Sequence, residues 1–433
     1  MKFLRPAMVA TFLVATLLLS NFLNTKVESS KFSESFPAVV CPPNAKAMNT
    51  FVSASSQKTQ FRKLTGKTLP LRAVKHLRFP ITSDPILLNG GEVTSALWQS
   101  VTNTWAGATL CLSPRSDEWF VGGAGNITSK GRLLLVNSGL SEAVADIATW
   151  SEKGAQFDKS VPVPANSFIQ VNLDLLAPGQ SRLAIHVTPR SGRISAFMVD
   201  ERRKGLIKLG GDLITPMFSA KADLVITAIP HANGNHAKAK HVLRLLVPGN
   251  LDANIHIELV STDGTFTPVG LDSKRIARGV VVDIPLNPTI DTSAFSLRIH
   301  SDEPLVAGVF PSMSVGGHSD FVWSSPSELM APLKLAINGL RPTFIFTGDN
   351  IAITVTTQLT NGKLKRTSIS GTDFASWKAL ENTQTVSFSE ISKSTYGAAI
   401  VTSTNGKGTF PLESGSVRTL SSQPTSSIEV IRR

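Results

Sequence analysis

The sequence is poor in charge and in cysteine, and both shortages exclude classes of protein. Charged residues make up 17% of the 433 residues, against roughly 25% in an average soluble protein. The two cysteines exclude a disulfide-dense scaffold and a four-cysteine zinc site. A content of 31 glycines and 25 prolines disfavours long helical bundles, and 42% hydrophobic residues exclude wholesale disorder. A chain of this length is expected to hold about three domains.

Motifs of catalysis and cofactor binding are lacking as well. The chain has no His-Glu-x-x-His zinc motif, no Gly-x-Ser-x-Gly elbow, no phosphate loop and no dinucleotide-binding glycine motif. Three evenly spaced histidines, His231, His236 and His241, are weak candidates for a metal site. Lys238 and Lys240 lie beside them and repel a cation. We therefore expect no enzyme activity, no cofactor and no metal, and interpret the segment as a basic loop.

The N-terminus has the pattern of an export segment. Lys2 and Arg5 precede a stretch without charge from residue 6 to 25, and residues 7–19 are almost purely apolar. This pattern is typical of a signal peptide, and its length approaches that of a membrane span. We expect residues 1–26 to be a signal peptide or a signal anchor helix. The protein is then extracytoplasmic, either secreted or anchored to the cytoplasmic membrane by residues 6–25.

Export changes the interpretation of the two cysteines. Outside the cytoplasm thiols tend to pair, so we expect a disulfide between Cys41 and Cys111. It would close a loop of about 70 residues and contribute about 4 kcal/mol in the loop-entropy model. The alternative is two separate buried thiols.

A basic stretch follows the export segment. No acidic residue occurs between Glu34 and Asp84, and we expect a basic linker over residues 27–84. It could contact an anionic surface, such as lipid headgroups or an acidic envelope polymer, or serve as a mobile spacer. Nucleic acid is not expected as a partner, because export removes it and no binding motif accompanies the charge. The eight cations of this stretch are Lys46, Lys58, Arg62, Lys63, Lys67, Arg72, Lys75 and Arg78.

The rest of the chain shows internal similarity. Three segments alternate small or apolar residues with polar ones and end at Lys-Gly, Asp-Gly or Asn-Gly; they begin at Ala143, Ala253 and Ile351. Alternation with period two that ends in such a dipeptide predicts a strand running into a hairpin. The repeat of roughly 100–110 residues fits a β-sandwich and is too long for propeller blades or solenoid units.

We therefore predict an all-β chain of three tandem, immunoglobulin-like β-sandwich units, over residues 85–205, 206–318 and 319–433. Each unit is expected to close with a hairpin, at residues 183–196, 295–307 and 398–410. Trp98 or Trp105 could stack on a sugar, although scattered tryptophans more often serve the core.

The order of several motifs resembles a known family. Cys41-Pro42 is followed by Cys111-Leu-Ser-Pro114, then Trp119-Phe-Val-Gly-Gly123, then Leu134-Leu-Val-Asn137 and the alternating strand from Ala143. This order resembles the exported actinobacterial family called domain of unknown function 5719. Cys-Pro-Pro replaces the expected Cys-Pro-Gly. The resemblance implies export and envelope association, and brings no catalytic residues.

Function is then expected at the cell envelope. We expect a noncatalytic binding or scaffolding module whose partner is an envelope polymer, an envelope protein or anionic lipid. One alternative is an electrostatic tether to anionic polymer or lipid. The other is a hydrolase acting on envelope glycans, because a glycosidase draws its carboxylates from distant positions that no motif marks. The carboxylates available for it are Asp117, Glu118, Asp302, Glu303 and Asp320.

Overall fold

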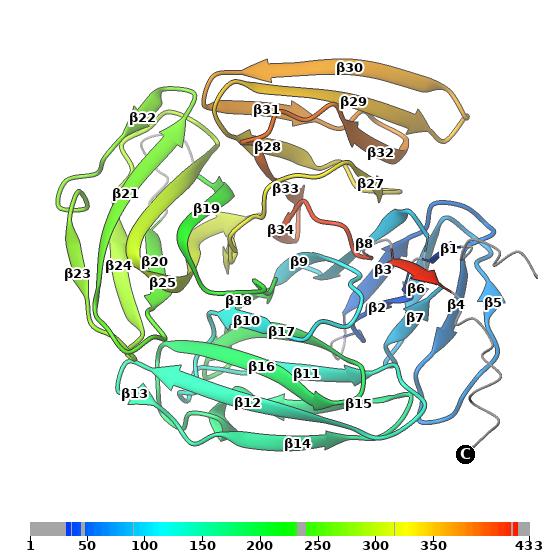
Figure 1. Ribbon diagram of the computed structural model, residues 1–433, viewed down its shortest axis with the longest axis horizontal. Coiled ribbons are helices and arrows are strands. Elements are labelled where there is room, and N and C mark those ends of the chain that lie inside the picture. The colour runs from blue at the N-terminus through cyan, green and yellow to red at the C-terminus, as the bar shows by residue number, and fades with distance from the viewer. Residues whose placement is uncertain are drawn as a thin grey trace, which may run out of the picture. The chain divides into compact units, whose positions relative to one another are not determined.

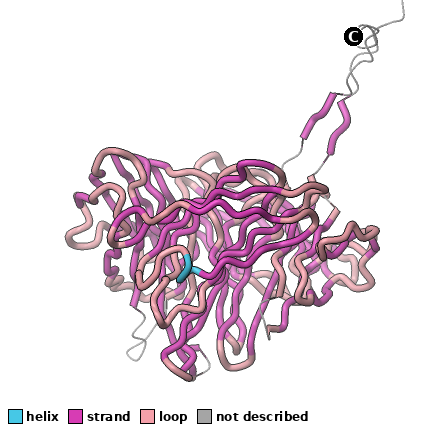
Figure 2. The backbone as a smooth tube through the Cα atoms, turned by 90° about the horizontal axis from the view of Figure 1, so that it is seen from below, coloured by secondary structure: helices cyan, strands magenta, loops and turns pink. Residues whose placement is uncertain are grey.

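A computed structural model describes residues 32–35, 37–44, 48–89, 91–231, 240–315, 317–416 and 419–422. Within these ranges the fold is nearly all β (Figure 2), and the helical structure is one short 3-10 turn, η1 (Leu173–Leu175). The prediction of an all-β chain is confirmed. No helix of the described ranges is long and apolar enough to cross a bilayer. The export segment expected at residues 1–26 lies outside them.

The chain divides into two compact units. The smaller comprises Met1–Phe36 and Arg418–Arg433, and the larger comprises Pro37–Val417. In the described part of the smaller unit, β1 (Phe32–Ser35) pairs antiparallel with β35 (Thr419–Ser422).

Four sets of strands follow one another through the larger unit, and the strands of each set pair in two groups (Figure 1). Set 1 covers residues 39–110 and set 2 covers residues 118–214. The strands of set 1 are β2 (Val39–Cys41), β3 (Asn49–Ser53), β4 (Gln60–Lys63), β5 (Arg72–Ala73), β6 (Arg78–Ile81), β7 (Ile86–Leu88), β8 (Val93–Val101) and β9 (Trp105–Leu110). Those of set 2 are β10 (Glu118–Val121), β11 (Arg132–Asn137), β12 (Ala143–Ser151), β13 (Gly154–Ala155), β14 (Lys159–Val163), β15 (Ser167–Asn172), β16 (Leu183–Ser191), β17 (Ile194–Lys204) and β18 (Ile207–Ile214).

Set 3 covers residues 221–321 and set 4 covers residues 333–411. The strands of set 3 are β19 (Lys221–Pro230), β20 (Lys240–Leu246), β21 (Ala253–Ser261), β22 (Gly264–Phe266), β23 (Lys274–Ile276), β24 (Val282–Leu286), β25 (Ala294–Val315) and β26 (His318–Phe321). Those of set 4 are β27 (Leu333–Ala336), β28 (Thr343–Thr347), β29 (Ile351–Leu359), β30 (Leu364–Gly371), β31 (Phe374–Lys378), β32 (Thr383–Ser389), β33 (Tyr396–Ser403) and β34 (Gly406–Pro411).

The same pairing order recurs in all four sets. If the main strands of a set are lettered a to h in chain order, one sheet has the order a-f-c-d and the other e-b-g-h. Set 1 gives β2-β7-β4-β5 and β6-β3-β8-β9, and set 2 gives β10-β16-β12-β14 and β15-β11-β17-β18. In set 3 the long strand β25 supplies both f and g, because its first half pairs with β21 and its second half with β20. The repeat is therefore fourfold where the sequence predicted three units.

The three predicted alternating strands are confirmed as the c strands of sets 2, 3 and 4. They begin at Ala143, Ala253 and Ile351, and in β12 every second residue is buried. The alternation places one face of each strand on a core that the two sheets of the set share. The turn glycines Gly154, Gly264 and Gly362 have positive φ, which the hairpins require.

Three expectations about organisation need correction. The linker expected over residues 27–84 is folded in its described part from Pro37 on, where it supplies β2 to β6 of set 1. The expected boundary at 205/206 separates the paired strands β17 and β18, and that at 318/319 falls inside β26. Of the closing hairpins, only β33–β34 pairs as one. The strands β16 and β17 lie in opposite sheets, and β25 is continuous.

The four sets are joined to one another rather than independent. Set 1 meets set 4 through a parallel pairing of β8 with β27, in which Thr94 lies opposite Leu335. The h strands β9, β18, β26 and β34 contact one another in a closed circuit, and β9, β18 and β34 lie in the middle of Figure 1. Trp119 of set 2 belongs to the core of set 3, and Trp323 packs into the core of set 2.

Candidate functional site

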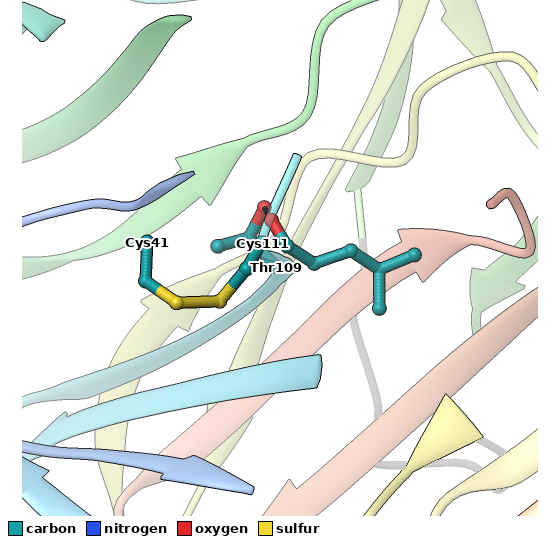
Figure 3. Close-up of a disulfide and its surroundings, with 4 residues drawn as sticks. Cys41, Thr109 and Cys111 are labelled. Carbon is teal, nitrogen blue, oxygen red and sulfur yellow. Dashed lines mark hydrogen bonds between the residues drawn. A yellow bond between two sulfur atoms is a disulfide. The ribbon is translucent and has the colours of Figure 1, made fainter. Parts of the chain in front are cut away.

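The predicted disulfide is confirmed. Cys41 at the end of β2 and Cys111 directly after β9 are joined across 70 residues, with their Cα atoms 4.4 Å apart (Figure 3). Both cysteines are fully buried. The neighbouring residues Val40 and Leu112 exchange two backbone hydrogen bonds of 2.8 and 3.0 Å. The disulfide therefore fastens the first strand of set 1 to the end of its last strand.

Three of the eight cations, all of them in set 1, have structural partners. Arg62 on β4 donates a 2.5 Å hydrogen bond to Oδ1 of Asn166 in set 2. Arg78 on β6 lies 4.6 Å from the Phe51 ring and donates to the Gly339 carbonyl of set 4 at 3.1 Å. Burial lowers the pKa of both arginines. Lys63 lies 3.8 Å from Asp84. These three side chains stabilise set 1 and its contacts.

Four other cations are exposed in the part of set 1 between β3 and β6. Lys58 lies between β3 and β4, Lys67 between β4 and β5, Arg72 on β5, and Lys75 between β5 and β6. All four are exposed, and none forms an ion pair with a described residue. We call Lys58, Lys67, Arg72 and Lys75 the basic face. Lys46, the eighth cation, lies outside the described residues.

A folded basic face differs physically from the spacer that the sequence predicted. Its cations are carried by a sheet and short loops, so fixing their backbone positions costs no further entropy on binding. Because no carboxylate of the described residues neutralises them, their positive potential extends into solvent. Such a face can attract a polyanion or an anionic surface, and its attraction falls as salt rises.

The three histidines of the weak metal candidate are only partly placed. The ring centroids of His231 and His241 lie 5.1 Å apart, and both rings meet Phe295 edge on. His241 is buried, and its Nε2 lies 3.0 Å from the Pro230 carbonyl. His236 lies outside the described residues. Within those residues no cluster of three or more histidine, cysteine or acidic side chains is arranged to hold a metal.

The carboxylates considered for a hydrolase have separate partners. Asp117 lies 2.6 Å from Nε2 of His186, whereas the adjacent Glu118 accepts a 2.9 Å hydrogen bond from the Ala196 backbone. Asp320 on β26 accepts from the Gly211 backbone at 3.4 Å. Asp302 is held by Asn254 at 2.7 and 2.8 Å, and Glu303 follows it in the chain. The sequence candidates are thus placed in different local environments.

Two of these carboxyl groups are deeply buried and keep their protons to high pH. Burial raises the pKa of Glu118 to about 8, although the Ala196 N–H and Arg115 oppose the shift. Burial also raises the pKa of Asp320 to about 8, against backbone donors. One oxygen of each group, Oε1 of Glu118 and Oδ2 of Asp320, is buried without a hydrogen-bond partner. A catalytic acid needs reach to substrate, and full burial of these groups disfavours that role.

Trp98 and Trp105 are buried in the cores of sets 4 and 1, and leave little surface for sugar stacking.

A polar hollow of about 400 Å³ between sets 3 and 4 was missed by sequence reasoning. Its lining includes His256, Glu258, Arg298, His300 and Tyr396. The first four lie on the solvent face of neighbouring strands, where His256 is opposite His300 and Glu258 is opposite Arg298. The alternating polar positions of β21 and β25 carried this signal, but the strand pairing that unites them cannot be derived from one sequence.

The charges in this hollow are mostly satisfied by one another. His300 lies 2.6 Å from Asp223, and Arg298 lies 3.3 and 3.4 Å from Asp349 and Asp373 of set 4. A hydrogen bond to the Asp272 backbone leads the interactions that raise the pKa of His256. We interpret the cluster as an ionic contact between sets 3 and 4, because its cations already have carboxylate partners.

Comparison with known proteins gives one match. Residues 94–369 match the model of a family described as "Family of unknown function (DUF5719)". A search of curated proteins finds no match. The matched range starts in β8 and ends in β30, so it includes the whole of sets 2 and 3.

Proposed function

Since this chain belongs to the family of unknown function DUF5719, which brings no reaction with it, we propose its function from its own residues. It is an exported, noncatalytic cell-envelope protein that acts as a binding or scaffolding module. The basic face is the observation that carries this proposal: Lys58, Lys67, Arg72 and Lys75 are exposed on a folded support and lack carboxylate partners among the described residues. Its proposed partner is an anionic polymer of the envelope or anionic lipid.

Two features support export. Lys2, Arg5 and the apolar residues 7–19 have the pattern of a secretion signal or anchor. The disulfide of Cys41 and Cys111 is typical of oxidising compartments outside the cytoplasm. We propose that the chain is secreted or anchored by residues 6–25, with Pro37–Val417 on the outer side.

We also propose that each set is an immunoglobulin-like β-sandwich repeat. In set 2, β11 pairs with β15 and β12 pairs with β16 in the opposite sheet. These correspond to the central B–E and C–F pairs of immunoglobulin sandwiches. The outer strands are exchanged, because β10 lies beside β16 and β17 beside β11. Four such repeats provide a broad scaffold on which set 1 presents the basic face.

The hydrolase alternative has less support. Its candidate acids have separate partners, and Glu118 and Asp320 are buried against backbone donors. We therefore place the binding role first and the electrostatic tether within it.

Charge reversal tests the proposal. The variant K58E/K67E/R72E/K75E of the full chain is expected to lose at least tenfold in co-sedimentation with cell-wall polyanion or with vesicles containing phosphatidylglycerol, at about 0.1 M salt. The matched control K153E/K159E/K204E/K365E changes the same net charge at exposed lysines of sets 2 and 4. It is expected to retain most of the binding. Equal losses in both variants, or no loss in the first, would reject the basic face as the binding surface.

A further inference from the structure

A small polar hollow opens beside Lys58 in set 1. Its volume is about 210 Å³, and its lining comes from the β3–β4 loop, the end of β7, the start of β8 and Ser416. None of the described residues that line it is acidic or aromatic. The parallel pairing of β8 with β27 holds its floor in place, since Thr94 and Ser95 lie opposite Leu335 and Ala336.

The floor of the hollow consists of residues with hydroxyl groups that can form further hydrogen bonds. Thr94, Ser95 and Ser416 are 4, 4 and 5% exposed. Thr94 Oγ1 accepts a 2.9 Å hydrogen bond from the Gly415 N–H, which leaves its own proton to donate. The Ser416 hydroxyl donates to the Pro37 carbonyl at 2.9 Å and keeps acceptor capacity. The Ser95 hydroxyl forms no hydrogen bond to any described residue and is not one of the buried side-chain atoms left without a partner, so it is open to the hollow. These hydroxyl groups can therefore exchange hydrogen bonds with a ligand in the hollow.

The rim carries exposed donors that are also unused. Lys58, Gln60 and Asn89 are exposed and line the hollow. Within the described residues their side chains have no hydrogen-bond or ion-pair partner. The ammonium group, two amide groups and the floor hydroxyls can donate hydrogen bonds from several directions. Val39, Leu88 and Val93 supply an apolar side that suits a short carbon chain.

We propose that this hollow binds a phosphate ester bearing hydroxyl groups, of which the glycerol phosphate unit is the smallest example. Donors that converge from several directions suit the three charged oxygens of a phosphate, and charge-assisted hydrogen bonds from Lys58 strengthen them. A lining without carboxylates does not repel the anion. The inference rests on the proposed function and deepens it, because the hollow would select the repeating unit that the basic face attracts. Both an envelope polymer and a lipid headgroup contain this chemistry.

Titration of the full chain with sn-glycerol 3-phosphate tests the hollow. We expect saturable binding, and none of uncharged glycerol at the same concentration. K58M, S95A and N89A are each expected to weaken binding about tenfold. The control K75M, which removes a charge of the basic face outside the hollow, is expected to bind as the wild type does. N89A alters an exposed side chain and leaves the fold unaffected, so its result stands even if S95A lowers stability.

Two further arms separate the sources and the two proposals. Competition experiments are expected to identify which source occupies the hollow. If glycerol phosphate displaces the polymer, the source is the envelope polymer. If it displaces phosphatidylglycerol vesicles but not phosphatidylcholine vesicles, the source is the lipid headgroup. Absence of saturable glycerol phosphate binding, or wild-type affinity in K58M, S95A and N89A, would overturn the proposal that the hollow binds a phosphate ester. Polymer binding that persists in S95A and N89A while glycerol phosphate fails to bind would retain the basic face and reject the hollow. Glycerol phosphate binding without polymer binding would retain the hollow and reject the basic face.

Discussion

Single buried carboxyl groups hold neighbouring sets together. Asp212 Oδ2 accepts a 2.7 Å hydrogen bond from the Trp323 backbone, and Asp200 accepts a 2.9 Å bond from the Trp323 indole. Arg202 pairs with Asp200 at 2.8 Å, whereas burial raises the pKa of Asp212. These contacts join β17 and β18 of set 2 to the segment after β26. These hydrogen bonds and this ion pair are structural contacts, and because they involve buried carboxyl groups they make the free energy of unfolding depend on pH.

Replacement of two other buried acids, Glu118 and Asp320, is expected to reduce the dependence of the free energy of unfolding on pH. Glu118 and Asp320 have a folded pKa of about 8, above their ordinary values of 4.5 and 3.8. Between those limits the folded chain binds more protons than the unfolded chain, so the free energy of unfolding falls as pH rises. Each group contributes a slope of about 1.4 kcal/mol per pH unit in this range. E118Q and D320N are each expected to lose one such contribution, and the raised pKa of Glu413 and of Asp212 maintains the remaining slope.

Urea unfolding from pH 5 to 8 measures this dependence. The control D302N removes an exposed carboxyl whose pKa is lowered by hydrogen bonds from Asn254, so its contribution to the pH dependence lies below pH 4 and the slope from pH 5 to 8 is expected to be unchanged. A wild-type slope that persists in both E118Q and D320N would show that these acids titrate normally.

Strands with a clear alternating pattern were predictable, and short ones were not. The c strands of sets 2 to 4 have nine residues each, which is enough for period two to appear. The c strand of set 1, β4, has four residues, Gln60–Lys63, and none is fully buried. The sequence of set 1 therefore resembled that of a linker. The basic residues are evident in the sequence, but their division into structural and exposed groups depends on Asn166 and Gly339, which lie far away in the sequence.

The disulfide is expected to compensate for the short strands of set 1. C41A/C111A should lower the free energy of unfolding by about 2–4 kcal/mol, because the closed loop spans 70 residues. Reductant is expected to destabilise the wild type by a similar amount and to leave the double variant unchanged. Urea denaturation with and without reductant measures both effects. Equal stability of reduced and oxidised wild type would contradict this role.

At the scale of the larger unit, the contact between β9 of set 1 and β34 of set 4 depends on glycine. A Cβ added at Gly408 of β34 would lie 2.4 Å from the Ala108 backbone nitrogen of β9, and one at Gly406 would lie 2.5 Å from the Ala106 nitrogen. Sets 1 and 4, the ends of the unit, thus approach each other as closely as backbones allow. This contact brings residues about 300 positions apart together, which explains why the sequence predicted separate tandem units.

G408A is expected to lower the free energy of unfolding by about 1–3 kcal/mol, because the added methyl group forces β34 away from β9. G249A adds the same group at an exposed glycine with open space around it, and is expected to be near neutral. Thermal unfolding of the two variants measures the difference. If both variants unfold at the same temperature as the wild type, β9 and β34 are not in close contact.

In the proposed function, the net charge of +12 acts through the folded basic face. The most direct measurement is the dissociation constant of the full chain from an anionic glycerol phosphate polymer, at about 0.1 M and about 1 M salt. We predict that the wild type loses at least tenfold in affinity over this range, and that K58E/K67E/R72E/K75E binds weakly at both concentrations. Wild-type affinity that is independent of salt, or a quadruple variant that retains the wild-type salt dependence, would show that the basic face is not the binding surface.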